Sequence, residues 1–226
     1  KKHPNGASET VLAIDKVWKL DTDRHAGLEA QVAALADDVA YTAHDIDDGL
    51  RSGYITLEQL QELPLVGSIL RDIKLEFPNL TGKRQRHEMN RRLISLLVRD
   101  VLEETRTRLN DKKPQTPDDI RNAGITFVRF SDKLMPDERV LRKFLYDNLY
   151  RNFRVNRVRL KTTRVVRDLY TVFMERPDTL PEHWQARIEK GGPEKQRARV
   201  VADYVAGMTD RFALDTHNRL FDISAT

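Results

Sequence analysis

Helical periodicity of apolar residues covers nearly the whole chain, and this feature most restricts its fold. The longest periodic stretch runs from about residue 82 to residue 110, and its expected buried side carries Leu93, Leu96, Leu97, Val101 and Leu102. Other helices are expected at about 27–50, 56–63, 65–76, 136–151, 154–175 and 194–220, with a short one beginning at Pro117. Only residues 125–130, "ITFVRF", have the pattern of a strand. The sequence therefore predicts an all-α protein with at most one short strand pair.

Composition excludes several classes of protein. The 226 residues include no cysteine, so disulfides and thiolate metal sites are excluded, and a cytoplasmic location is expected. No apolar run approaches the roughly 20 residues that span a bilayer, so no membrane association is expected. The first residues, "KKHPNG", lack the apolar core of a signal peptide. Because residue 1 is not methionine, we expect the chain to begin inside a longer protein.

One helix has an unusual distribution of acids. Residues 35–50, "LADDVAYTAHDIDDGL", contain five aspartates, and residues 32–46 contain no lysine, arginine or glutamate. At about 100° per residue, Asp37, Tyr41 and Asp45 form an inclined row about 12 Å long, among alanines and opposite the apolar side. A solvated face would usually carry Lys, Glu, Gln and Arg, so these acids are expected to be partly buried.

Two interpretations of this acidic side remain open from the residues alone. It is either a solvated acidic face that ends the helix or the wall of a site for a metal or polar ligand. The dipeptide His44-Asp45 does not decide between them. His44 lies two turns beyond Asp37, a rise of about 10.5 Å, so the two side chains are not expected to share one ion. We expect His44 to pack or to form a hydrogen bond.

The segment "LEAQVAALADDVAYTAHDIDDGLRSG" resembles the part of bacterial deoxyguanosine triphosphate triphosphohydrolases, in the HD-domain superfamily, that carries their last metal ligand. The resemblance continues through "RHEMNRRLISLLVRDVLEETRTRL", "FLYDNLYRNFRV" and "DYVAGMTDRFALDTHNRLF". It implies the C-terminal portion of an HD-type helical bundle. Residues 1–110 would be the C-terminal part of the HD core, and residues 111–226 the helical C-terminal region of the same family.

The resemblance also implies an activity and roles for residues. Members of the family hydrolyse deoxynucleoside triphosphates to deoxynucleoside and tripolyphosphate with a divalent metal ion, here Mg²⁺ or Mn²⁺, and a homo-oligomer is expected. Asp37 would be the last metal ligand, Tyr41 would pack under the deoxyribose, and Asp45 would bond a sugar hydroxyl. "KKHP" resembles a family element whose lysine contacts phosphate, so Lys2 is a candidate phosphate ligand.

The chain departs from the family pattern in its metal ligands. The family's first His and its His-Asp pair have no match here, since no histidine of the chain stands in a matching motif. These ligands, together with the catalytic residues, are expected upstream of residue 1. The chain alone is therefore expected to be inactive. The sequence does not indicate the preferred nucleobase, the native metal or activation by a second nucleotide.

Residues 139–167 form a basic segment with interleaved aromatic side chains. They contain ten Lys or Arg and a single acid, Asp147. Three interpretations remain open: a solvated amphipathic face, a surface for triphosphate or another subunit, and a surface for single-stranded nucleic acid. The last gives the alternative function, a non-catalytic α-helical module that binds nucleotide or nucleic acid through this segment.

Overall fold

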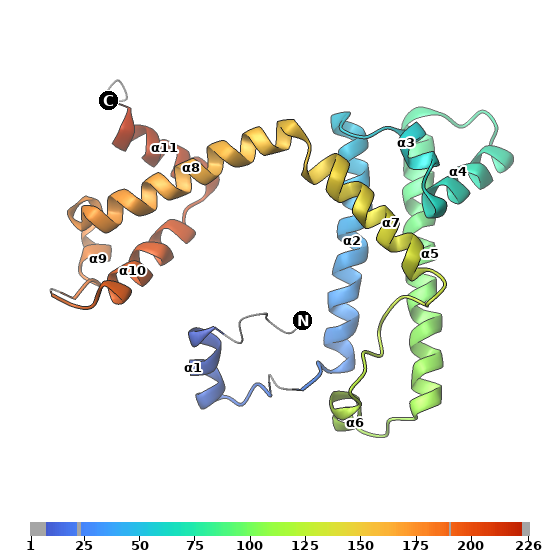
Figure 1. Ribbon diagram of the computed structural model, residues 1–226, viewed down its shortest axis with the longest axis horizontal. Coiled ribbons are helices and arrows are strands. Elements are labelled where there is room, and N and C mark those ends of the chain that lie inside the picture. Colours follow the sequence, from blue (N-terminus) through green and yellow to red (C-terminus); the bar gives the residue numbers. More distant parts are fainter. Residues whose placement is uncertain (1–7, 22–23, 190, 223–226) are drawn as a thin grey trace. The chain divides into compact units, whose positions relative to one another are not determined.

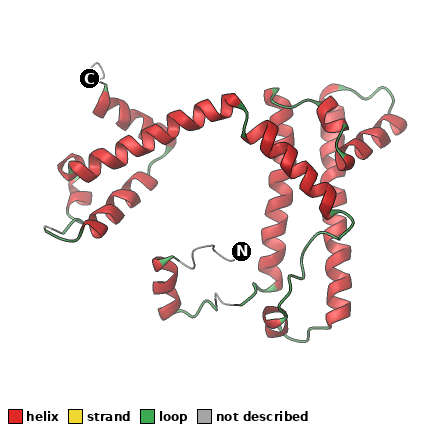
Figure 2. Ribbon diagram, viewed as in Figure 1, coloured by secondary structure: helices red, strands yellow, loops and turns green. Residues whose placement is uncertain are grey.

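The computed structural model describes residues 8–21, 24–189 and 191–222, and every regular element within them is a helix (Figures 1 and 2). The all-α prediction is confirmed. The α-helices are α1 (Glu9–Val17), α2 (Leu28–Ser52), α3 (Leu57–Gln61), α4 (Pro64–Glu76), α5 (Gly82–Lys112), α6 (Pro117–Asn122), α7 (Met135–Leu145), α8 (Phe153–Glu175), α9 (Glu182–Gln185), α10 (Glu194–Ala206) and α11 (Asp210–Phe221). A π-turn follows α7 at Tyr146–Tyr150, and a 3₁₀ turn lies at Pro177–Thr179. Among the described helices, none has the length and apolarity needed to cross a membrane.

The chain divides into two compact units, residues 1–150 and residues 151–226. The sequence had suggested a boundary at 110/111, on the loop after the longest helix. The compact units divide after α7, because α7 packs on α4 and α2 and so belongs to the first unit. The boundary at 110/111 separates regions of the family and stays a prediction.

The core of the first unit lies among α2, α4, α5 and α7, with α2 beside α5 (Figure 1). Ile46 of α2 and Leu93 of α5 are fully buried there, as expected from the apolar sides of these two helices, and Leu141 of α7 is fully buried as well. Gly53 ends α2 in a left-handed conformation with φ of 70°, which a glycine adopts without strain. Leu102 is an exception to the expected pattern: it is 52% exposed, although its neighbour Val101 packs against the core.

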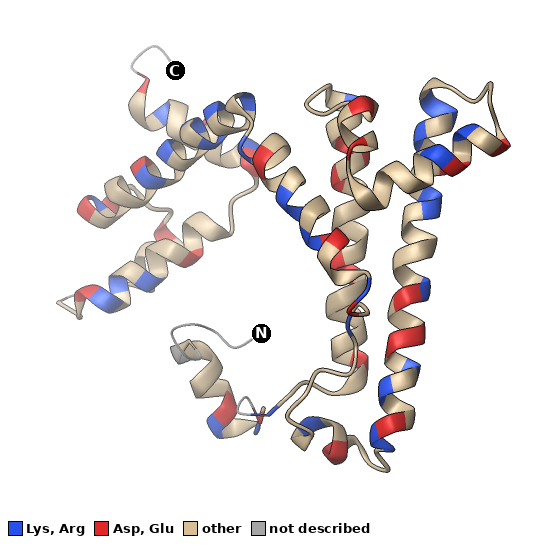
Figure 3. Ribbon diagram, turned by 45° about the vertical axis from the view of Figure 1, so that its right-hand side comes forward, with Lys and Arg blue, Asp and Glu red and all other residues tan. Residues whose placement is uncertain are grey.

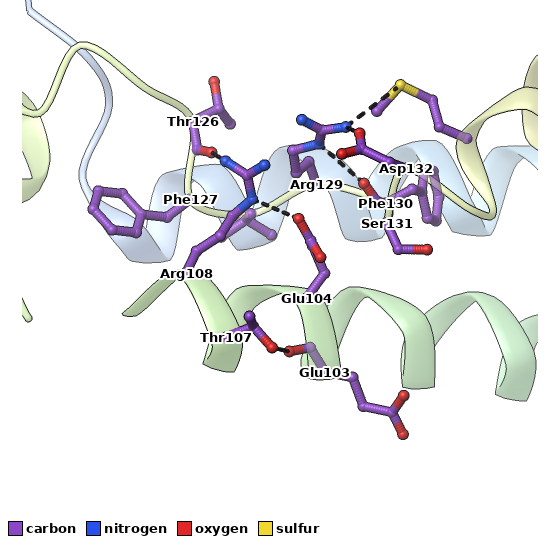
Figure 4. Close-up of polar contacts among 12 residues, drawn as sticks. Glu103, Glu104, Thr107, Arg108, Thr126, Phe127, Arg129, Phe130, Ser131 and Asp132 are labelled. Atoms are coloured by element: carbon purple, nitrogen blue, oxygen red, sulfur yellow. Dashed lines mark hydrogen bonds and ion pairs between the residues drawn. The ribbon is translucent and has the colours of Figure 1, made fainter. Parts of the chain in front are cut away.

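Residues 125–130 do not form the expected strand. Two of their backbone N–H groups, at Phe127 and Val128, donate to the side-chain oxygen of the buried Gln31 at 2.8 and 3.2 Å. On the other side, Arg108 of α5 donates to the Thr126 carbonyl at 3.3 Å (Figure 4). The apolar side chains are buried as in a strand, but helix side chains satisfy the backbone where a second strand would do so.

The second unit packs α8 against α10 and α11. Its core contains Leu169, Phe173, Val201 and Tyr204, and the Phe173 and Tyr204 rings meet edge to face at 5.2 Å. The expected single helix at 194–220 is in fact two helices. The chain breaks at Gly207 and Met208, and Thr209 then accepts a hydrogen bond from the Phe212 N–H to cap α11.

The close packing of α4 on α3 predicts a large loss of stability for Gly67→Ala. A Cβ atom at Gly67 would lie 2.2 Å from the Gln61 carbonyl oxygen, and this backbone atom cannot rotate away. We expect the free energy of unfolding, measured by urea titration, to fall by about 3 kcal/mol. The control is Gly27→Ala, whose new Cβ would have no neighbour nearer than 3.7 Å and should cost less than about 1 kcal/mol. Equal losses for both variants would contradict the steric argument.

Candidate active-site pocket

A pocket of about 350 Å³ lies in the first unit, between α2 on one side and α7 with its π-turn on the other. Its lining contains three aromatic rings, two carboxylates and one guanidinium. The lining residues are Asp38, Tyr41, Thr42, Asp45, Arg142, Leu145, Tyr146 and Tyr150. Its volume and mixed lining are in the range of small-molecule sites.

Asp45 and Tyr150 join the two walls of this pocket. The Tyr150 hydroxyl donates a hydrogen bond to the Asp45 carboxylate. Burial and this bond to the carboxylate raise the pKa of Tyr150 to about 12. The hydroxyl therefore keeps its proton at neutral pH and remains a donor. Asp45 in turn presents a carboxylate acceptor inside the pocket, and Tyr150 already orients one of its oxygens.

Arg142 is the cationic residue of the pocket lining, and it contacts two acids, Glu138 and Asp38. Its Nε and Nη2 atoms donate to one oxygen of Glu138 at 2.9 and 2.6 Å, and Nη2 also lies 3.8 Å from Asp38. Burial alone would lower the pKa of Arg142, but the bond to Glu138 and the charges of both acids raise it. Glu138 is only 6% exposed, whereas the Arg142 side chain is 54% exposed. Glu138 thus fixes the position of the guanidinium, while more than half of the Arg142 side chain stays exposed. This arrangement suits an anionic ligand.

The structure separates the members of the row predicted on α2. Asp45 is half-buried in the pocket, and Tyr41 lines its edge while remaining 61% exposed. Asp37, one turn before Tyr41, is exposed and outside the lining, so the expected partial burial does not extend to it. His44 is exposed as well. Lys2 lies outside the described residues.

Asp37 does not form a metal site with its described neighbours. In the part of the chain that the structure describes, no three side chains of His, Asp or Glu are close enough together to hold an ion. One exposed carboxylate on a stable helix can supply a single ligand to a divalent cation, whereas binding requires further ligands. The described residues therefore fit one member of a ligand set and not the whole set.

Comparison with known proteins gives consistent relatives over almost the entire chain. A protein of Azorhizobium caulinodans named "Deoxyguanosinetriphosphate triphosphohydrolase-like protein" is 46% identical over 224 residues, which cover 97% of this chain and 56% of the relative. Proteins with the same name are 45% identical in Cereibacter sphaeroides, over 90% of this chain and 54% of theirs, and 43% identical in Rhizobium meliloti, over 95% and 53%. The chain is thus similar to these proteins over 90% or more of its own length. It spans about half the length of the curated relatives that it matches.

A family model described as "Phosphohydrolase-associated domain" matches residues 128–219. The match includes α7 and the π-turn, which form the second wall of the pocket, and continues through the second unit into α11. The comparisons thus confirm the resemblance to deoxyguanosine triphosphate triphosphohydrolases seen in the sequence. They also direct attention to the part of the pocket that the sequence had not singled out.

On the wall of the pocket opposite α2, the sequence missed three site residues: Arg142, Tyr146 and Tyr150. They follow one another at intervals of four, like the row on α2, and so lie along one side of their helix. The sequence had placed them within a basic segment without separating their face from the rest. The π-turn at Tyr146–Tyr150 is a second signal, since such turns are frequent at functional sites.

Proposed function

We propose that the full-length protein hydrolyses deoxynucleoside triphosphates to deoxynucleoside and tripolyphosphate. The observation that carries this proposal is the pocket between α2 and α7, in which an oriented guanidinium and an acceptor carboxylate lie among three tyrosines. Arg142 is beside Asp38, at the end of the pocket nearer Asp37, and suits a phosphate. Asp45 is two turns further along α2 and suits a sugar hydroxyl. The names of the relatives support the same class of substrate.

In this proposal Asp37 supplies one ligand to a divalent metal ion, Mg²⁺ or Mn²⁺, and the remaining ligands come from outside the described residues. Such an ion polarises the α-phosphate and lowers the pKa of the attacking water. The chain's own residues orient the substrate: Arg142 binds the phosphates, and Asp45 with Tyr150 fixes the sugar. Because the described residues supply one ligand, the 226-residue chain by itself is expected to have no turnover.

The test is product analysis with the full-length protein. Each of the four deoxynucleoside triphosphates is incubated with the protein and Mg²⁺ or Mn²⁺, and the products are separated by anion exchange. Equal amounts of deoxynucleoside and tripolyphosphate are expected, with much slower turnover of the ribonucleotides. Release of pyrophosphate or orthophosphate, or no hydrolysis of any deoxynucleotide with either metal, would refute the proposal.

Tyr41 is expected to discriminate against ribonucleotides. Its ring stands at the edge of the pocket between Asp37 and Asp45, where it would crowd a 2′-hydroxyl on a sugar bound to Asp45. Tyr41→Ala should therefore raise the relative kcat/KM for ribonucleotides by about tenfold, as expected when one steric contact is removed. The measurement is kcat/KM for matched deoxy- and ribonucleoside triphosphates. An unchanged ratio would mean that Tyr41 does not contact the sugar.

Asp45 and Tyr150 are expected to act as one unit. Asp45→Asn removes the ionised acceptor and keeps the shape, so kcat/KM should fall roughly ten- to hundredfold, through a lost charge-assisted bond worth about 1.5–3 kcal/mol. Tyr150→Phe should also slow turnover, because Asp45 then loses its oriented partner. In a double-mutant cycle the two effects should be non-additive, since both remove the same contact. Strict additivity would show that the Asp45–Tyr150 bond does not matter for catalysis.

A further inference from the structure

A second pocket, of about 610 Å³, lies between α8 and α10 within the second unit. It shares no lining residue with the pocket between α2 and α7. Val166 and Tyr170 of α8 and Ala202, Val205 and Ala206 of α10 supply most of its lining. These side chains are half-buried or exposed, so the pocket opens to solvent. An apolar ligand that covered them would remove apolar surface from water, which is favourable.

The pocket also contains two polar side chains, Thr163 and Arg167, that are available to a ligand. They are one helical turn apart and share one side of α8. The neighbouring Thr162 hydroxyl already donates to the Val158 carbonyl at 3.2 Å. In the part of the chain that the structure describes, the Thr163 hydroxyl has no hydrogen-bond partner, and no carboxylate lies within ion-pair distance of Arg167. A hydroxyl and a guanidinium placed in this way can both donate to one anionic group.

The charges around this pocket favour an anion. The sequence contains no acid between Asp147 and Asp168, and Figure 3 shows Lys and Arg recurring along α8. Asp168 itself faces another side of α8, about 200° round the helix from Val166, where it lies 3.0 Å from His217 of α11. Arg167 is therefore the single charged residue among the described residues of the lining, without an acid to neutralise it.

We propose that this pocket binds the free anion of a fatty acid, with the carboxylate on Arg167 and Thr163 and the alkyl chain along the apolar lining. A guanidinium group matches a carboxylate in both charge and bidentate geometry. From Thr163 to Tyr170, α8 rises by about 10.5 Å, which gives the alkyl chain an apolar path of this length. The pocket volume of about 610 Å³ is in the range of small-molecule sites.

Two other occupants fit this pocket less well. A lipid bilayer takes up apolar side chains that protrude from a protein surface, whereas these side chains line a hollow. A partner protein usually requires about 20–30 residues on each side of an interface, far more than line this pocket. A single alkyl chain with one anionic group matches the apolar lining and its one unpaired cation.

The test is calorimetric titration of the full-length protein with dodecanoate, at concentrations below those at which it forms micelles. One dodecanoate should bind per chain. Octanoate has four fewer methylene groups and should bind at least tenfold more weakly, since each buried methylene contributes roughly a factor of four. Dodecyltrimethylammonium, which has the same alkyl chain and the opposite charge, should also bind at least about tenfold more weakly.

Two variants separate the carboxylate contact from the alkyl contact. Arg167→Gln should weaken dodecanoate binding by about tenfold or more and change the binding of the uncharged dodecanol less than about twofold. Ala206→Phe, which fills the pocket, should abolish the binding of both compounds. Arg211→Gln is the matched control, because the Arg211 side chain is 93% exposed on α11 and lies outside the lining. It should change dodecanoate binding less than about twofold. Circular dichroism checks that each variant is folded.

Three results would overturn the proposal. The first is no binding of dodecanoate below the micelle concentration, including the case in which the protein binds phosphatidylglycerol vesicles instead. The second is equal weakening by Arg167→Gln and Arg211→Gln, which would show that the carboxylate does not contact Arg167. The third is unchanged binding to Ala206→Phe, or several dodecanoate ions bound per chain with similar affinity, which would show that the alkyl chain does not enter this pocket.

Discussion

Replacing Asp37 by alanine in the full-length protein is expected to abolish bound metal and to lower kcat/KM by roughly a thousandfold or more. A catalytic metal ion contributes several kcal/mol to transition-state stabilisation, and about 1.4 kcal/mol corresponds to a tenfold change in rate. The fold should survive, because Asp37 is exposed on α2 and contributes nothing to the core. The measurements are metal content after dialysis, kcat/KM for a deoxynucleoside triphosphate, and the helical circular dichroism signal.

Asp48→Ala is the matched control for this variant. Asp48 is also exposed on α2 and lies three turns further along the same side, about 20° round the helix from Asp37. It should retain metal and nearly full activity. Asp38, the sequence neighbour of Asp37, is a poorer control because it lies 3.8 Å from Arg142 and lines the pocket. Metal retained by Asp37→Ala, or an equal loss for Asp48→Ala, would show that Asp37 is not the ligand.

The helices and one wall of the pocket could be predicted from local patterns. A row at intervals of four residues is a property of a single helix, so the row from Asp37 to Asp45 follows from the sequence of α2 alone. The second wall required tertiary information. Tyr150 is 105 residues from Asp45 in the chain, and their contact arises only when α7 and its π-turn pack along α2. No local pattern in either segment specifies the other as its neighbour.

The sequence predictions that differ from the structure also lacked tertiary information. Residues 125–130 have the composition of a strand, but composition does not reveal whether a second strand is present to pair with it. Here Gln31 and Arg108 provide the hydrogen bonds instead. Similarly, the basic segment 139–167 is continuous in sequence but is divided between the two units at 150/151. Arg142 therefore lines the pocket of the first unit, while Arg157 and Lys161 lie on α8 in the second unit.

Arg142→Ala is expected to lower kcat/KM by about a hundredfold or more. The substitution removes a charge-assisted contact with the phosphates, worth about 1.5–3 kcal/mol. It also leaves the buried Glu138 carboxylate without its partner, and this charge would then repel a triphosphate. The binding of an unreactive triphosphate analogue, measured by calorimetry, should weaken in parallel, whereas the binding of the free deoxynucleoside should change little.

The effect of the unpaired Glu138 carboxylate can be separated from the effect of the lost phosphate contact. In Arg142→Ala combined with Glu138→Gln, the stray buried charge is absent, so part of the lost activity, about tenfold, should return. Arg139→Ala, one turn earlier on α7 and outside the pocket lining, is the matched control and should be nearly silent. If the free deoxynucleoside and the triphosphate analogue lose affinity equally in Arg142→Ala, the guanidinium shapes the pocket rather than binding phosphate. If Glu138→Gln restores nothing, the loss comes from the missing phosphate contact alone.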